Sequence, residues 1–407
     1  MAFHILVNSL FGGGAELQAA LLARVLKPAS FLILEEEPSP ALPDTPRHSA
    51  LAERCPVFPG AAKTLLLPFY AKRLAARVNP GDTVLSFMER SNFVNVLAAR
   101  KSGHRAVICE VTQPSREFSG ARGFFMKPLI QKLYPEAGLV ISNSKGNARD
   151  LEGNFGFAPG KIKVIYNSCD TGTARRKAAE PLESFYEPVF RRPVIITSGR
   201  LTAAKGQWHL LKSFAGVKRE VPGAALVLLG DGELHETLVG ICAALGLKTF
   251  DAGRSAAPAG DEDVFFAGFV ANPYKYLARA KVFAFPSLWE GLPNAVLEAL
   301  ACGLPVVASD CLSGPRELLA PATEFSKEAA APEAADCGYL MPPFEVLPPG
   351  FSDKTEAAGR MWTAKLAELL RDEAGLKVFG EAARKRAEEF SPAVKAAEWL
   401  GTLGLTR

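Results

Sequence analysis

Short apolar runs alternate with longer amphipathic stretches along most of this chain, and this alternation limits its fold more than any other feature. Runs that are apolar throughout, rather than at every second residue, are typical of parallel strands buried on both faces. They occupy residues 4–7, 31–34, 83–87, 106–109, 139–141 and 163–165 in the first half, and 194–197, 225–229, 264–266, 282–285 and 305–308 in the second. Amphipathic stretches such as 15–25 and 93–99 predict the connecting helices. Each half therefore predicts one doubly wound α/β domain.

The length of the chain supports two domains. At 407 residues one core is not expected, because single cores stop growing near about 250–300 residues. Residues 170–192 are rich in Arg, Lys, Ala, Glu and Pro without a clear period, which predicts a linker. We therefore expect an N-terminal domain of residues 1–172, a C-terminal domain of residues 173–390, and a last helix within residues 391–407.

Two glutamates flank a predicted helix start between residues 286 and 299, in the sequence Pro-Ser-Leu-Trp-Glu-Gly-Leu-Pro-Asn-Ala-Val-Leu-Glu-Ala. Glu290 follows an apolar run, and Pro293 and Asn294 predict a helix whose first turn also holds Glu298. Backbone N–H groups at a helix start attract anions, and carboxylates accept hydrogen bonds from hydroxyls. A ligand that combines sugar, diphosphate and ribose fits this layout. A solvated loop glutamate and an ordinary acidic helix turn are the simpler alternative.

Two cations follow the predicted strand 194–197. Arg200 comes at the strand end, in Gly-Arg-Leu, and Lys205 comes in the next loop, before a glycine. Cleavage of a sugar–diphosphate bond builds negative charge on the leaving phosphate, and fixed cations lower that barrier. Arg offers a fork to two phosphate oxygens, whereas Lys acts as a point charge. Two solvated basic residues are the alternative interpretation.

A glycine-rich turn follows the first predicted strand, in Asn8 to Glu16. Its backbone can approach a ligand closely, and Gly13 and Gly14 are the candidate contacts. The turn lacks the Gly-Lys-Ser/Thr ending of a P-loop, and Leu17 stands where a dinucleotide fingerprint needs its third glycine. An ordinary tight turn is an equally good interpretation.

Glu89 and Glu110 each follow a predicted strand of the first half. Ligands gather at the carboxyl ends of parallel strands, so either glutamate could orient an acceptor hydroxyl or assist its deprotonation. Alternatively, both simply hydrogen-bond loops. Residues 115–134 mix four basic residues with aromatic and aliphatic ones. That mixture suits an anionic membrane surface, or an ordinary amphipathic helix with extended basic side chains.

Composition argues against several other classes. Residues 1–190 hold 23 basic and 17 acidic residues and the remainder 24 and 26, far from the basic stripe of a nucleic-acid binder. Asp261-Glu262-Asp263 matches the metal-binding Asp-x-Asp pattern, but its Gly/Ala/Pro-rich surroundings favour a solvated loop. Five His and seven Cys show no zinc spacing. We therefore expect a metal-independent reaction. Unpaired cysteines and the lack of a signal peptide or a long apolar span predict a cytoplasmic protein.

These segments resemble the retaining nucleotide-sugar glycosyltransferases of family four. Glu290 and Glu298 match that family's Glu, seven residues, Glu motif, and residues 196–206 look like its Gly-Arg-Leu and Lys-Gly signature. Residues 298–310, 313–317 and 161–167 are similar to further parts of the family pattern. The resemblance implies the GT-B fold, in which two doubly wound Rossmann-like domains face a cleft and the last helix often crosses back to the first domain.

The family also implies roles for these residues. Arg200, Lys205 and Glu290 would be catalytic, the cations at the phosphate and the glutamate at hydroxyls of the transferred sugar. Glu298 would hold the ribose. Backbone of the turn and of the glycine loop would line the donor, at Gly291, Leu292, Pro293, Asn294, Gly13 and Gly14. Pro293 has no N–H, so it can only shape the turn.

The implied activity is transfer of a hexose or N-acetylhexosamine from a nucleotide diphosphate, with UDP expected, to a hydroxyl of a glycan or lipid-linked glycan. This transfer needs no cofactor and belongs to bacterial surface polysaccharide or glycoconjugate synthesis. We expect the protein to be peripheral on the inner face of the cytoplasmic membrane, with residues 115–134 as the contact. Residues 109–113, Cys-Glu-Val-Thr-Gln, depart from the Ser-Glu-Arg-Asn of similar relatives, so the acceptor class stays open. The alternatives are a GT-B nucleotide-sugar epimerase and a non-catalytic sugar-nucleotide-binding subunit.

Overall fold

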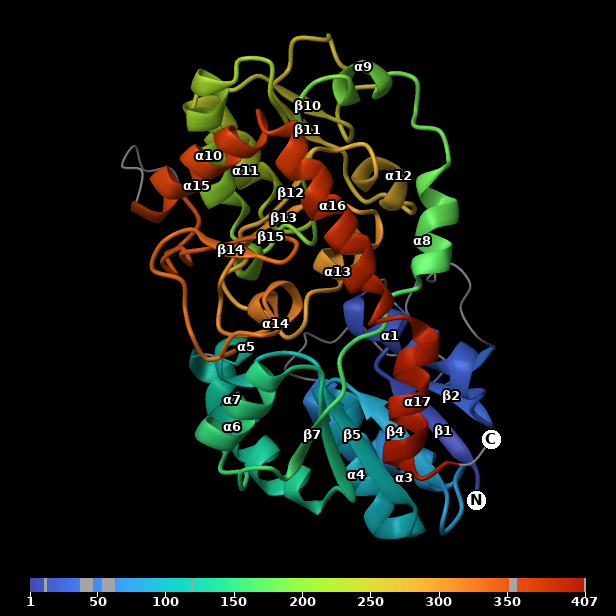
Figure 1. Cartoon of the computed structure of the whole chain (residues 1–407). Coiled ribbons are helices and arrows are strands. Elements are labelled where there is room, and N and C mark those ends of the chain that lie inside the picture. The colour runs from blue at the N-terminus through green and yellow to red at the C-terminus, as the bar shows by residue number, and fades with distance from the viewer. Residues whose placement is uncertain (11–12, 37–46, 53–62, 119, 351–356, 406–407) are drawn as a thin grey trace. The chain divides into compact units, whose positions relative to one another are not determined.

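The computed structural model describes every residue except 11–12, 37–46, 53–62, 119, 351–356 and 406–407. It divides into two compact units (Figure 1). Unit 1 comprises Met1–Ser168 together with Phe390–Arg407, and unit 2 comprises Cys169–Glu389.

Unit 1 is built on a seven-stranded sheet in which every pair of neighbouring strands is parallel, in the order β3-β2-β1-β4-β5-β6-β7. The strands are β1 (Phe3–Val7), β2 (Ser30–Glu35), β3 (His48–Ala52), β4 (Thr83–Phe87), β5 (Arg105–Glu110), β6 (Leu139–Ser142) and β7 (Ile162–Val164). The six strands predicted for this half are confirmed. β3 was missed because His-Ser-Ala-Leu-Ala offers a single large aliphatic side chain and begins with two exposed residues.

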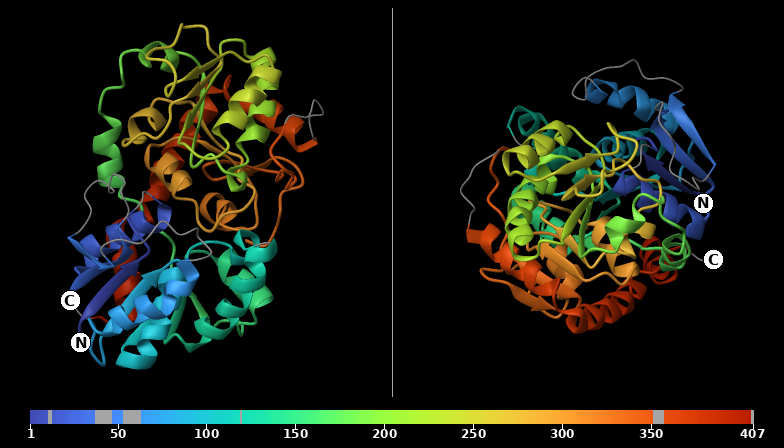
Figure 2. Two further views of the ribbon diagram at one scale, coloured as in Figure 1. Left: turned by 180° about the vertical axis from the view of Figure 1, so that it is seen from behind. Right: turned by 90° about the horizontal axis from the view of Figure 1, so that it is seen from above.

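Helices cover both faces of this sheet, so the doubly wound prediction is confirmed (Figures 1 and 2). Alternate strand residues such as Leu6 and Ile5 enter two separate cores. One core contains the helices of residues 67–75, 89–102, 120–133 and 145–155, and the other contains the helix of residues 14–26 and Trp399. The helices of unit 1 are α1 (Gly14–Leu26), α3 (Leu67–Ala75), α4 (Glu89–Ser102), α5 (Pro114–Glu117), α6 (Gly120–Leu133), α7 (Lys145–Phe155) and α17 (Pro392–Leu403), with the short turns η1 (Thr64–Leu66) and η2 (Tyr134–Glu136).

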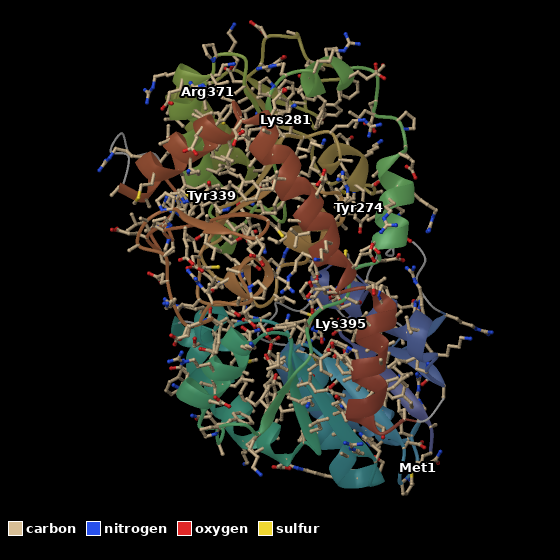
Figure 3. All side chains as sticks on the ribbon, viewed as in Figure 1. Met1, Tyr274, Lys281, Tyr339, Arg371 and Lys395 are labelled. Atoms are coloured by element: carbon tan, nitrogen blue, oxygen red, sulfur yellow. The ribbon has the colours of Figure 1, made fainter. Side chains whose placement is uncertain are left out.

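The terminal helix α17 packs within unit 1. The Trp399 ring lies 6.2 Å from that of Phe87 on β4. The ammonium of Lys395, labelled in Figure 3, lies 5.6 Å from the ring of Tyr166. These contacts attach the last segment of the chain to the fold that its first segment builds.

Unit 2 has an eight-stranded sheet in the order β10-β11-β9-β8-β12-β13-β15-β14, parallel except for the β14–β15 pair. The strands are β8 (Val194–Ser198), β9 (Ala225–Leu229), β10 (Thr249–Asp251), β11 (Val264–Phe266), β12 (Val282–Phe285), β13 (Val306–Ser309), β14 (Glu333–Ala335) and β15 (Gly338–Met341). The five predicted strands are confirmed. β10, β14 and β15 were not predicted. β10 and β14 are the edge strands and are too short to contain a long apolar run, and β15 lies between β13 and β14.

The helices of unit 2 include two that the sequence did not predict. Residues 170–192, expected to form a linker, contain α8 (Thr171–Ala178) and α9 (Glu187–Phe190). The Asp170 side chain caps α8 by accepting the N–H of Thr173 at 2.8 Å, and this basic helix has no apolar stripe that periodicity would detect. The others are α10 (Gln207–Glu220), α11 (His235–Ala244), α12 (Tyr274–Leu277), α13 (Asn294–Ala301), α14 (Pro315–Leu319), α15 (Ala357–Leu369) and α16 (Glu373–Glu388), with the turn η3 (Ala203–Lys205).

Within the parts of the chain that the structure describes, no helix combines the length and apolar character needed to cross a bilayer.

Candidate active site

The Gly-Arg-Leu loop after β8 is held by the loop after β9. Leu201 donates its N–H to the carbonyl of Asp231 at 2.9 Å. A Cβ on Gly230 would overlap the Gly199 carbonyl, and one on Gly232 would lie 2.5 Å from that of Leu201. Only glycine permits this approach of two backbones. Arg200 is thereby fixed at the strand end with an exposed side chain, and no described carboxylate pairs with it.

The Lys-Gly turn is fastened to the loop after β12. Leu288 donates its N–H to the Ala204 carbonyl at 2.8 Å. Gly206 has a φ of 61°, and a Cβ there would overlap the Pro286 carbonyl. As a result Lys205 Nζ lies 2.5 Å from Glu290 Oε1, with the two side chains 23% and 10% exposed. The structure thus brings together two of the predicted catalytic residues.

The turn from Gly291 to Asn294 is shaped by the loop after β13. Ser313 Oγ donates to the Gly291 carbonyl at 2.8 Å. Gly314 has a φ of 92°, and a Cβ there would lie 2.5 Å from Pro293 Cδ. Gly291, Leu292 and Pro293 are buried and Asn294 is half-buried. The turn is therefore rigidly supported from behind.

The predicted position of Glu298 in α13 was wrong by one turn. Pro293 is the N-cap in an extended conformation and the helix begins at Asn294, so Glu298 falls in the second turn. Proline has no N–H to join the helix hydrogen bonds, which suits it to the entry position.

Glu298 is a half-buried carboxyl without a hydrogen-bond donor among the described residues. Burial raises the pKa of Glu298 to about 7. Its neighbours Tyr274 (Figure 3), Cys169 and Cys302 have pKa values raised chiefly by burial and further by the charge of Glu298. A carboxylate in such surroundings gains most from hydroxyl donors supplied by a ligand.

In unit 1, Gly13 is the N-cap of α1 and Gly14 its first residue. A Cβ on Gly13 would overlap the Glu16 carboxylate, which folds back over the helix start. Phe11 and Gly12, from the same predicted glycine loop, lie outside the described residues. The start of α1 therefore has the glycine that lets a ligand approach the backbone closely, and the Glu16 carboxylate lies beside that glycine.

The acceptor-side candidates Glu89 and Glu110 are also brought together. Thr112 Oγ1 lies 3.1 Å from Glu89 Oε1 and 3.0 Å from Glu110 Oε1. Tyr134 donates its O–H to Glu110 Oε2 at 2.7 Å. Sequence reasoning missed Thr112 and Tyr134. The only available signal for Thr112 was a hydroxyl two residues after a strand-end carboxylate, and Tyr134 gave none.

The Asp-x-Asp segment has other partners. Asp261 pairs with Lys248, and Asp263 lies 2.7 Å from Lys218 Nζ. Glu262 accepts the N–H groups of two preceding loop residues. Across the described ranges, no cluster of His, Cys, Asp and Glu has the arrangement of a metal site.

Comparison with known proteins supplies the family. Residues 192–340 match the model described as Glycosyl transferases group 1, and residues 12–173 match Glycosyltransferase Family 4. An N-acetylgalactosamine-N,N'-diacetylbacillosaminyl-diphospho-undecaprenol 4-alpha-N-acetylgalactosaminyltransferase of Campylobacter jejuni is 34% identical over 324 residues, 77% of this chain and 82% of that protein. The chain belongs to the group 1, family 4 glycosyltransferases. It therefore transfers a sugar from a nucleotide sugar, in a family that retains the donor configuration.

Other relatives of this glycosyltransferase are more distant or matched in part. An uncharacterized glycosyltransferase of Methanocaldococcus jannaschii is 36% identical over 226 residues, 54% of this chain and about half, 52%, of that protein's length. Anabaena HepE in complex with UDP and glucose aligns over 100% of both chains with a TM-score of 0.70 at 18% identity. Sucrose-phosphate synthase from Thermosynechococcus elongatus covers 99% of this chain and 98% of its own, with a TM-score of 0.74 at 17% identity. These structures confirm the predicted GT-B fold.

Proposed function

We propose that this glycosyltransferase moves a hexose or N-acetylhexosamine from UDP, without a metal, to a hydroxyl of a lipid-linked glycan in bacterial surface polysaccharide or glycoconjugate synthesis. The observation that carries the proposal is the contact of Lys205 with Glu290 at the end of two adjacent parallel strands. Ligands of α/β sheets gather at such strand ends.

The proposed chemistry assigns one task to each part of the donor. Lys205 and Arg200 stabilise the charge that develops on the leaving diphosphate. Glu290 accepts hydrogen bonds from hydroxyls of the transferred sugar and orients Lys205. Glu298 accepts those of the ribose. Backbone N–H groups of the turn meet the phosphates. In unit 1, the backbone N–H groups after Gly13 at the start of α1 are a separate candidate contact for an anion.

Two relatives support the choice of donor and acceptor. HepE has been solved with UDP and glucose, and the Campylobacter jejuni relative is named for transfer of N-acetylgalactosamine to a diphospho-undecaprenol acceptor. Independence from metal is supported by the carboxylates of residues 261–263, which already pair with lysines or backbone N–H groups.

A thermal-shift screen of UDP, GDP and ADP and their sugars, with EDTA present, tests the donor site. UDP and one UDP-sugar are expected to stabilise the protein, since a ligand that binds only the folded state raises its stability by about 2.7 kcal/mol at 100 times its Kd. Glu298→Ala is expected to lose most of that shift. The exposed Glu328 supplies a matched control, and Glu328→Ala should respond like the parent.

Absence of any response to all three nucleotides contradicts the donor site. A response that requires Mg²⁺ contradicts only the metal-independent part. Binding of a UDP-sugar without turnover on any lipid-linked acceptor would favour a non-catalytic subunit.

We also propose that α5 and α6 meet an anionic membrane. Phe124 and Phe125 are 76% and 68% exposed, with ring centroids 5.3 Å apart. The Arg122 guanidinium lies 4.8 Å from the Phe118 ring. Two large aromatics that face solvent beside basic residues suit the interface between lipid headgroups and acyl chains, whereas Met126 and Ile130 of the same helix enter the core.

Liposome flotation tests this surface. The parent is expected to float with vesicles containing anionic lipid, and the variant with Arg116, Arg122, Lys127 and Lys132 changed to Gln should lose most binding, since each basic residue contributes about 1 kcal/mol near such a surface. The control changes four exposed basic residues of unit 2 to Gln, namely Lys248, Arg254, Lys281 and Arg371. If the first variant floats like the parent, this surface is not the anchor.

A further inference from the structure

Two carboxyls lie side by side where the neighbouring strands β4 and β5 end. Phe87 pairs with Cys109 in the sheet, and Glu89 and Glu110 follow these partners. Glu110 is 0% exposed and Glu89 is 7% exposed. Two ionised carboxylates this close in a buried setting repel each other strongly.

Glu110 is surrounded by hydrogen-bond donors. Its Oε1 accepts the backbone N–H groups of Val111 and Thr112 at 3.0 and 3.1 Å. Its Oε2 accepts the Tyr134 hydroxyl at 2.7 Å, and that hydroxyl in turn accepts an N–H of Asn92 at 3.1 Å. Donors on both oxygens favour the negative charge on Glu110.

The Thr112 hydroxyl bridges the two carboxyls, at 3.1 Å from Glu89 Oε1 and 3.0 Å from Glu110 Oε1. A hydroxyl has one hydrogen, so it can donate to only one of them. The other oxygen then faces the hydroxyl lone pairs, which is favourable only if that carboxyl carries a proton. With a single hydroxyl hydrogen between two carboxyl oxygens, this hydrogen-bond pattern therefore requires one proton on the pair of carboxyls.

The backbone before Glu89 is strained in a way that fixes its position. Met88 has a φ of 71°, in the left-handed region that non-glycine residues rarely occupy. Asn8 on the adjacent strand end holds this conformation by accepting the N–H and O–H of Ser91 at 3.1 and 2.8 Å.

We propose that Thr112 joins Glu89 and Glu110 into one proton-sharing pair, in which buried Glu110 carries the charge and Glu89 holds the proton and meets the acceptor hydroxyl. In this arrangement Glu89 donates its O–H to Thr112 Oγ1, and Thr112 donates to Glu110 Oε1. Thr112 is thus a positioning residue. The inference rests on the proposed function, because it specifies how the acceptor side of that reaction is protonated.

Only part of the pair is open to a substrate. Glu89 has some exposure and Thr112 is half-buried, whereas Glu110 has none. Gln113, which follows Thr112, is buried, and its Oε1 has no hydrogen-bond partner among the described residues. An acceptor hydroxyl can therefore reach Glu89 without contacting Glu110.

The proton is retained at neutral pH. Burial, and then repulsion between the two carboxylates, raises the pKa of Glu110 to about 8, and burial raises the pKa of Glu89 as well, so the pair as a whole keeps one proton. The donors that surround Glu110 place that proton on Glu89. The groups facing the pair are Tyr134 and Cys109, whose own pKa values are raised by burial, and the more distant Glu117 and Arg122. Above about pH 8 the pair loses its proton, repulsion separates the carboxyls, and Glu89 leaves its position.

The first test is the pH profile with a lipid-linked acceptor. We expect kcat/KM for the acceptor to fall about tenfold per pH unit above about 8, while hydrolysis of the donor without acceptor stays level. Thr112→Val should raise the acceptor KM about tenfold and move the alkaline fall to lower pH, because the hydroxyl makes two hydrogen bonds to the singly protonated pair but only one to the doubly ionised pair. Thr112→Ser keeps the hydroxyl and should restore the parent's acceptor KM and the parent's pH of the alkaline fall. An unmoved fall in Thr112→Val would overturn the proposal.

The second test separates a protonated Glu89 from an ionised one. Glu89→Gln cannot ionise, so the alkaline fall should disappear while at least about a tenth of kcat/KM remains at pH 7; Glu89→Ala should lose about a hundredfold. If Glu89→Gln is as inactive as Glu89→Ala, Glu89 acts as a base and the proposal is wrong.

A third measurement does not depend on activity. In ¹³C NMR of protein labelled at glutamate carboxyls, one carboxyl should titrate near pH 8 in the parent, and no such signal should be present in Glu89→Gln. A parent without this titration overturns the pair. A parent that shows it but consumes no nucleotide sugar would instead sink the proposed function.

Discussion

Replacing Lys205 by alanine is expected to lower kcat about 100- to 1,000-fold, the loss typical when one preorganised donor to a developing negative charge is removed. The ammonium lies 2.5 Å from Glu290 and is largely shielded from water, so its charge acts with little screening. The KM for the donor should change less, because the diphosphate gains additional charge only as the bond breaks. Steady-state kinetics of UDP release with saturating acceptor measures both.

Lys248→Ala is the matched control. Lys248 forms an ion pair with Asp261 in the same unit, but both side chains are exposed. Exposed pairs contribute little, so this variant should retain kcat within about twofold. If Lys205→Ala retains kcat within the same range, Lys205 does not stabilise the leaving phosphate.

Replacing Glu290 by alanine is expected to lower kcat about 100- to 1,000-fold, as much as the change of Lys205 to alanine. The change removes the group proposed to hold the sugar hydroxyls, and it also removes the carboxylate that contacts Lys205 Nζ at 2.5 Å. Because the two side chains act as a unit, the double variant Lys205→Ala, Glu290→Ala should fall no more than about tenfold below the worse single variant.

Glu236→Ala removes an exposed ion pair with Arg254 and controls for loss of a carboxylate. It should leave kcat within about twofold. If the fold-loss of kcat in the double variant equals the product of the losses in the two single variants, Lys205 and Glu290 act independently, which contradicts the proposed arrangement.

Most of the fold could be predicted from the sequence because buried parallel strands are apolar throughout. Residues 225–229, for example, begin and end in the structure where the apolar run does. β3 and β14 could not be predicted, because they lie at sheet edges where pairing with a neighbour, rather than burial of a run, makes the strand. The capped basic helix α8 has no periodic apolar face, so the sequence predicts a linker there.

The candidate site was predictable in its residues but not in its contacts. The strand-end positions of Arg200, Glu89 and Glu110 follow from the parallel topology. The contact of Lys205 with Glu290 depends on how Gly206 packs against Pro286, and this close approach is a property of the folded loops. The hydroxyl of Thr112 contacts both Glu89 and Glu110 only because β4 and β5 lie side by side in the folded sheet.

A crystal structure of the protein with UDP is the decisive test of the donor site in unit 2. We predict both ribose hydroxyls within hydrogen-bond distance of the Glu298 carboxylate, and the diphosphate contacted by Arg200 and Lys205 with no metal ion between them. UDP bound away from these three side chains would show that the donor site lies elsewhere.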